Sequence, residues 1–121
     1  MTDYKIKIIE IENLKNAKEE IVKIGSDPKS IPIMAPKMIT KVIRLENVRL
    51  QDAIIIKQDM LSVGGEVAVP KNTFELYDKN ATILVIGTIS QLNELVDKLS
   101  RHYSRIKKIA DELKDVLKEI K

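Results

Sequence analysis

The chain has 121 residues, of which 44% are hydrophobic and 32% charged, and its 21 basic and 18 acidic side chains leave a net charge of +3. This length and balance predict a single folded domain over residues 1–121 rather than a disordered chain. The absence of cysteine excludes disulfides, thiolate metal sites and thiol nucleophiles. Because aromatic residues are only 3% and the charges are interleaved, a nucleic-acid partner is disfavoured.

No apolar run approaches the length of about twenty residues that a membrane span needs. The amino-terminal sequence MTDYKIKI also lacks the apolar centre of a signal peptide. We therefore expect a cytoplasmic protein with no membrane partner. The abundance of Ile, Lys and Glu resembles the composition of heat-adapted proteins.

The first elements predict a strand followed by a helix. Residues 5–11 (KIKIIEI) alternate as a strand does, and Asn13 stands where a helix N-cap belongs. Apolar residues then recur at helical spacing until Gly25, which is expected to end the helix. An opening βα unit is typical of alternating α/β architectures.

The next stretch is harder to assign. Residues 26–36 carry three of the four prolines, which predicts an extended segment over the core, either an ordinary crossover or a binding loop beside a site. Imperfect alternation favours a strand over residues 39–45, although Pro36 can instead start a short helix that runs to Val42. Asn47 is then expected to cap the following helix.

The sequence from Arg49 to Pro70 predicts a central helix that ends at Gly64-Gly65 and turns into a short strand over residues 66–69. Lys57 lies inside the apolar arc of that helix. Either its stem packs among the hydrophobic side chains and the ammonium reaches solvent at the helix end, or it is a cation at the floor of a pocket for an anionic ligand or a partner carboxylate. Because an unpaired buried ammonium is costly, a partner is expected in either case.

Residues 73–77 allow one more short strand, and residues 82–89 (TILVIGTI) predict a strand buried on both faces. Ser90 is expected to cap the next helix. Helical spacing then continues to Ile120, as one long helix or as two helices broken near residues 101–103, which we favour, with Ser104 capping the second. The predicted fold is α/β: one compact domain with a small central sheet of about four strands, mixed or mostly parallel, helices packed on it and two helices at the carboxyl end.

The turn after the strand at residues 82–89 is a candidate ligand site. Ligands of open α/β sheets gather beyond the carboxyl ends of strands, and amide groups at the start of a helix favour anions. The alternative is a strand-to-helix turn at Ser90 and a helix end at Gly64-Gly65 with no ligand. The candidate residues for binding a small anionic metabolite are Lys37, Arg44, Lys57, Gly64, Gly65, Gly87, Thr88 and Ser90.

No catalytic or metal-binding pattern is present in the sequence. The single histidine, His102, lies beside Arg101 and Arg105 and is expected at the surface. The carboxylates show no metal-ligand spacing, and no Gly-x-Ser-x-Gly turn occurs. We therefore assign no catalytic residue, no metal and no cofactor.

Several phrases resemble the amino-terminal extension of long-form dihydropteroate synthases. They are IMAPK (33–37), VIRLENV (42–48), IIKQDMLSVGGEVAVP (55–70), VIGT (85–88) and IADEL (109–113). The similarity covers roughly residues 5–118, and its most specific part is the stretch that contains Gly64-Gly65. In those enzymes the extension precedes the barrel that joins a dihydropterin diphosphate to p-aminobenzoate.

The catalytic loop of that family, of the type Asn-x-Thr-x-Asp-Ser-Phe, has no counterpart here, and the chain is too short for eight βα units. The resemblance therefore implies a non-catalytic accessory or interaction domain in pterin and folate chemistry. Its partner would be a dihydropteroate synthase barrel or a second copy of the chain. The alternative is a domain that binds or senses a pterin or another anionic metabolite.

Overall fold

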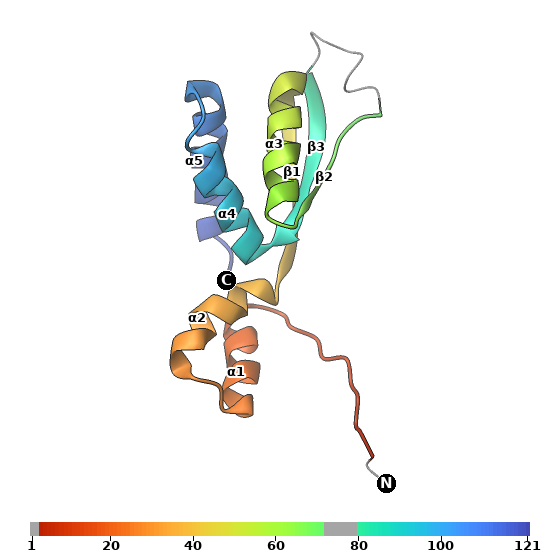
Figure 1. Cartoon of the computed structure of the whole chain (residues 1–121), viewed down its shortest axis with the longest axis vertical. Coiled ribbons are helices and arrows are strands. Elements are labelled where there is room, and N and C mark those ends of the chain that lie inside the picture. The colour runs from red at the N-terminus through yellow and green to blue at the C-terminus, as the bar shows by residue number, and fades with distance from the viewer. Residues whose placement is uncertain (1–2, 72–79) are drawn as a thin grey trace.

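The computed structural model describes residues 3–71 and 80–121, so the short strand predicted at residues 73–77 lies outside the described residues. The chain forms two lobes joined by a narrow waist (Figure 1). One lobe holds the sheet with three helices, the other holds the amino-terminal helix and short helical turns, and each has its own apolar cluster. Ile120, near the carboxyl end, packs against both clusters, which ties the lobes into one small mixed α/β domain.

The smaller lobe is built on α1 (Leu14–Ile24), whose predicted limits are confirmed. The side chain of Asn13 accepts a hydrogen bond from the Asn16 N–H at 2.8 Å, and Gly25 ends the helix at φ 79°. The following segment is helical, which makes the predicted extended crossover wrong. It forms η1 (Pro28–Ser30), α2 (Ile31–Met34) and η2 (Ala35–Lys37), each with a proline in its first turn, where the missing N–H has no cost.

The sheet of the larger lobe consists of β1 (Thr40–Arg49), β2 (Glu66–Ala68) and β3 (Asn80–Thr88). Its order is β1-β3-β2, and both pairings are antiparallel. The prediction of about four strands in a mixed or mostly parallel sheet is therefore wrong for the described residues. The helix between them does leave β1 and β2 parallel to each other, but β3 lies between them and runs the opposite way.

The larger lobe has three helices: α3 (Leu50–Ser62), α4 (Ile89–Leu99) and α5 (Ser104–Lys118). Helices α3 and α4 pack on the sheet, and α5 packs against α4. The predicted central helix and the two predicted carboxyl-terminal helices are confirmed. The core includes Ile56 and Met60 of α3, Val85 of β3 and Leu95 of α4, all fully buried. Among the described residues, no helix is long and apolar enough to cross a membrane.

Three predicted helix caps are wrong. Strand β1 continues to Arg49, and Asn47 lies in it with a positive φ of 59°, where the register between β1 and β3 shifts. Helix α4 is capped two residues earlier than predicted, by Thr88 rather than Ser90. Helix α5 begins at Ser104 after Tyr103, which makes no capping hydrogen bond with its side chain.

The strand predicted at residues 5–11 is not formed. Residues 3–12 make no strand or helix, and they leave the body as an extended segment beside the smaller lobe (Figure 1). Ile6 is 94% exposed and Ile8 is 89% exposed. The alternation of side chains typical of a strand is present, but no described part of the chain pairs with the segment.

Candidate functional site

Part of the predicted site does come together. Gly64 and Gly65 follow α3, Gly87 and Thr88 end β3, and all four line one open groove of about 410 Å³. The remaining lining residues are Thr40, Glu66, Ile86 and Gln91. The convergence follows from the strand register, because Glu66 at the start of β2 pairs with Ile86 near the end of β3.

Two of the glycines in the groove are needed for the packing of Met60. Gly64 adopts a left-handed conformation at φ +91° directly after α3. A Cβ atom on Gly65 or on Gly87 would lie 2.3 Å from the Cε atom of Met60, which is fully buried. The two glycines therefore leave the space that the Met60 side chain fills, so their presence alone does not show a ligand site.

The amide groups at the start of α4 are mostly used by the protein. The Thr88 N–H donates to Gln91 Oε1 at 2.9 Å, and the Gln91 N–H donates to Thr88 Oγ1 at 3.1 Å. The Ile89 N–H donates to the carbonyl of Ile39 at 3.0 Å. Few donors remain for an anion, and Ser90 does not line the groove.

Lys57 has protein partners, as both of its interpretations required. Its ammonium donates to the carbonyl oxygen of Val67 at 2.8 Å and to Glu66 Oε1 at 3.2 Å, which links α3 to β2. The Val67 N–H also donates to Glu66 Oε1, at 2.8 Å. This backbone hydrogen bond, followed by the one from Lys57, holds the pKa of Glu66 below its usual value.

None of the three predicted cations lines the groove, Lys57 included. Lys37 is exposed in η2, and Arg44 is exposed on β1; neither lines the groove. Sequence reasoning missed Thr40, Glu66 and Gln91. Only Gln91 had a local signal, because a Thr followed three residues later by a Gln is the pattern of a capping box.

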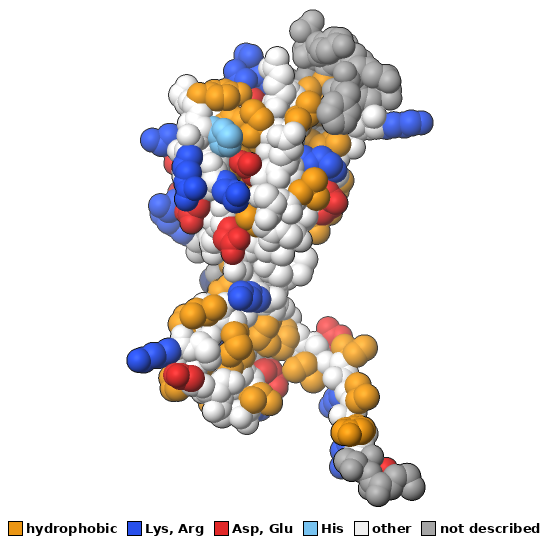
Figure 2. Space-filling view, viewed as in Figure 1, with side chains coloured by type: hydrophobic (Ala, Val, Ile, Leu, Met, Phe, Trp, Pro, Cys, Tyr) orange, Lys and Arg blue, Asp and Glu red, His pale blue; other side chains and the backbone are white. Residues whose placement is uncertain are grey.

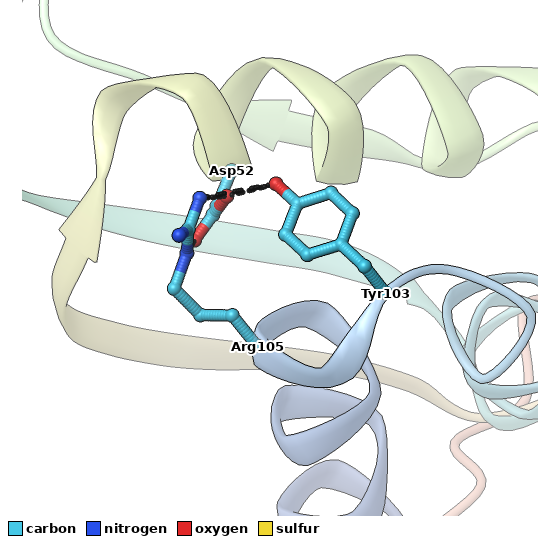
Figure 3. Close-up of polar contacts among 3 residues, drawn as sticks. All are labelled: Asp52, Tyr103 and Arg105. Atoms are coloured by element: carbon cyan, nitrogen blue, oxygen red, sulfur yellow. Dashed lines mark hydrogen bonds and ion pairs between the residues drawn. The ribbon is translucent and has the colours of Figure 1, made fainter.

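A second polar cluster joins α3 to the start of α5 (Figure 3). Asp52 is the buried acid, at 1% exposure. It accepts hydrogen bonds from Arg105 Nε at 2.6 Å, from the second Arg105 nitrogen at 2.8 Å and from the Tyr103 hydroxyl at 2.9 Å. Burial raises the pKa of Asp52, but the hydrogen bonds from Arg105 and Tyr103 outweigh it and leave the pKa lowered. The hydrogen bond to Asp52 raises the pKa of Tyr103.

A neighbouring pair strengthens the same junction. His102 Nε2 lies 3.0 Å from Asp59 Oδ2, so α3 meets the α4–α5 connection at a second point. His102, predicted at the surface, is partly exposed and paired. Within residues 3–71 and 80–121, no group of three or more His, Cys, Asp or Glu side chains is placed to hold a metal ion.

One known protein is similar over most of the chain. It is the bifunctional dihydropteroate synthase/dihydropteroate reductase of Helicobacter pylori, with 29% identity over 113 residues. The match covers 93% of this chain and 29% of that protein, so the chain spans less than a third of the relative's length. No protein-family profile and no solved structure matches the chain. The similarity supports a relation to an accessory region of a dihydropteroate synthase.

Proposed function

We propose that this chain is a non-catalytic accessory domain that works with a dihydropteroate synthase in pterin and folate biosynthesis. The observation that carries the proposal is the coverage of the similarity: nearly the whole chain matches a minor part of the Helicobacter pylori enzyme. The unmatched remainder of that enzyme is its larger part. We infer that a catalytic barrel, which takes about 250 residues, lies in that remainder and not in the matched region.

The polar side chains of the described residues support a structural role. The buried acid Asp52 is satisfied by Arg105 and Tyr103, and Lys57 is satisfied by β2. A buried acid that is already paired, such as Asp52, stabilises the fold and is not free to bind a substrate. These contacts hold the helices on the sheet and leave the outer surfaces for a partner.

The proposal is tested with a dihydropteroate synthase from the organism that encodes this chain, and in parallel with the Helicobacter pylori enzyme shortened by its matched region. Isothermal titration calorimetry with this chain measures binding, and synthase and reductase assays measure activity. We expect saturable binding and a rise in the activity or thermal stability of the shortened enzyme. Absence of binding to both enzymes, with both fully active alone, would overturn the proposal.

The groove supports a second candidate, a binding site for a pterin. The hydrogen bonds to the Glu66 carboxylate all fall on Oε1, which leaves Oε2 with acceptor capacity for N–H donors. A pterin ring carries a 2-amino group and a ring N–H side by side. No basic residue lines the groove, so its chemistry favours such a neutral donor over the anionic ligand expected from the sequence.

An amide NMR titration separates the two candidates. We expect a reduced pterin to shift the Gly64, Gly65 and Thr88 amide signals, while diphosphate does not. Glu66→Gln removes the carboxylate charge and should weaken binding about tenfold, since hydrogen bonds to charged groups contribute about 1.5–3 kcal/mol. Glu119→Gln, on the exposed end of the chain, is the matched control. If pterin shifts no signal, the groove candidate fails and the accessory-domain proposal is unaffected.

A further inference from the structure

The extended segment at residues 3–12 exposes apolar side chains at alternating positions. Tyr4 is 82% exposed, Ile6 94% and Ile8 89%. Figure 2 shows hydrophobic side chains spaced along this segment, apart from the body of the molecule. Exposed apolar surface is unfavourable in water, and a single strand has no stability without a neighbour. A partner that covers these side chains and pairs with their backbone is therefore favoured.

The course of the segment is fixed where it joins the smaller lobe. The Glu12 N–H donates to Asn16 Oδ1 at 3.1 Å, and the Leu14 N–H donates to the carbonyl of Lys121 at 3.2 Å. Ile11 packs against the apolar cluster of that lobe, and Ile9 lines a small cavity there with Ile21, Ile24, Met34 and Met38. These contacts direct the segment along the smaller lobe and away from the sheet of its own chain (Figure 1).

The sheet has a free edge of matching length. Strand β1 is ten residues long, and among the described residues it pairs with β3 alone. Its outer backbone groups are therefore a template for another strand. On the helix side of β1, Ile43 and Leu45 are only partly buried, and on the other side Val42 is 59% exposed. An added strand would cover apolar surface on both faces.

One antiparallel register matches the two sequences in both apolar and charged positions. With Ile8 opposite Ile43, the apolar pairs are Ile6–Leu45, Ile8–Ile43 and Ile9–Val42. In the same register Glu10 lies opposite Lys41 and Lys5 opposite Glu46, two pairs of opposite charge. Lys7 opposite Arg44 is the like-charged pair, between exposed positions where water screens it.

Neighbouring registers lose these matches. A shift by one residue in either direction moves every side chain of the segment to the other face. Lys7 then lies opposite Ile43 or Leu45, and its ammonium is directed at the helix-covered side. A shift by two residues breaks both pairs of opposite charge. The register with Ile8 opposite Ile43 is therefore the one that the side chains specify.

We propose that residues 5–11 of one copy pair as an antiparallel strand with the free edge of β1 in a second copy. Each copy gives one strand and receives one, so the exchange closes at a two-fold symmetric dimer. The contacts of Ile9 and Ile11 with the smaller lobe are partly given up, and each sheet gains a fourth strand from its partner. The arrangement removes an exposed strand edge and an exposed apolar segment together.

The absence of cysteine allows a direct test by cross-linking. A tagged full-length chain with Ile8→Cys is mixed with an untagged chain carrying Ile43→Cys and oxidised gently. We expect the mixed disulfide to form in high yield. Val22→Cys replaces Ile43→Cys in the control, because Val22 is exposed on α1 and lies outside the proposed contact. Equal yields in the two mixtures would overturn the register.

A second experiment tests whether the strand that pairs with β1 comes from a second copy of the chain. Sedimentation of the unmodified chain should show a dimer that Ile6→Asp with Ile8→Asp converts to a folded monomer. Glu10→Lys should weaken the dimer roughly tenfold, and adding Lys41→Glu should restore it, since each dimer carries the charge pair twice. A monomer at every concentration would overturn the proposal. A single chain with both Ile8→Cys and Ile43→Cys gives a further check. If its disulfide closes within a monomer, the segment pairs with β1 of its own chain and the dimer proposal is overturned.

Discussion

The Asp52 carboxylate and the Arg105 guanidinium meet through two hydrogen bonds, of 2.6 and 2.8 Å, although the residues are 53 positions apart in the sequence. Asp52 is in the first turn of α3, and Arg105 is in the first turn of α5. The Tyr103 hydroxyl donates to the same carboxylate, and the Tyr103 ring lies 5.1 Å from the guanidinium carbon. The contact fixes the position of α5 against the helix that packs on the sheet.

Replacing this acid is expected to destabilise the fold. Asp52→Asn keeps the size of the side chain but removes the charge that Arg105 pairs with. We expect the free energy of unfolding to fall by about 2 kcal/mol, which is within the range for hydrogen bonds to a charged group. The loss is not larger because water can still solvate the partly exposed Arg105 side chain. Urea denaturation measures the change. Asp97→Asn, at an exposed position of α4, is the control and should change it by less than about 0.5 kcal/mol.

The same contact predicts a dependence of stability on pH. The pKa of Asp52 is lowered in the folded chain relative to its ordinary value of 3.8. A lowered pKa contributes stability that is complete above the unfolded value and is lost as the pH falls through the folded value. The stability difference between the native chain and Asp52→Asn should therefore be constant from pH 7 to about pH 5 and shrink below about pH 4. A difference that stays constant down to pH 2 would contradict this origin.

Local signals explain what the sequence predicts well. Asn13 and Gly25 mark the ends of α1 because a cap acts on backbone groups only a few residues away. The same applies to the break between α4 and α5. The cap of α4 is also a local signal, because Thr88 and Gln91 have the spacing of a capping box. The prediction was wrong because Ser90, two residues later, is also a residue type that caps helices.

Nonlocal features explain what the sequence could not predict. The helix between β1 and β2 leaves them parallel, and nothing in either strand indicates that β3 inserts between them. The groove depends on that insertion, because it brings Glu66 beside Ile86 and so beside Thr88. The sequence predicts that Lys57 needs a partner, but the partner lies on β2, whose place in the sheet depends on its nonlocal pairing with β3.

The close packing of Met60 gives a further prediction. In Gly87→Ala the new Cβ atom would collide with the Met60 Cε atom, and overpacking of this kind costs about 1–3 kcal/mol. Shortening Met60 to Ala should lower the cost of the same glycine substitution, leaving the contact with Gln91 Oε1 at 3.0 Å, and a double-mutant cycle by chemical denaturation measures the difference. Gly25→Ala is the contrast: nothing lies within 4 Å of its Cβ position, so only its φ of +79° opposes it. The loss of stability caused by Gly25→Ala should therefore be the same with and without Met60→Ala.

Lys57→Met separates a structural role of the lysine from a role in ligand binding. The substitution removes the ammonium that bonds to Val67 and Glu66 but keeps the apolar stem among its neighbours. Because this ion pair is exposed to solvent, we expect the free energy of unfolding to change by less than about 1 kcal/mol. The freed Glu66 carboxylate is less well positioned, so pterin affinity should fall several-fold in the NMR titration. Lys98→Met, at a partly exposed position of α4, is the control. A Lys57→Met chain that binds pterin with native affinity would show that the Lys57–Glu66 contact serves only to join α3 to β2.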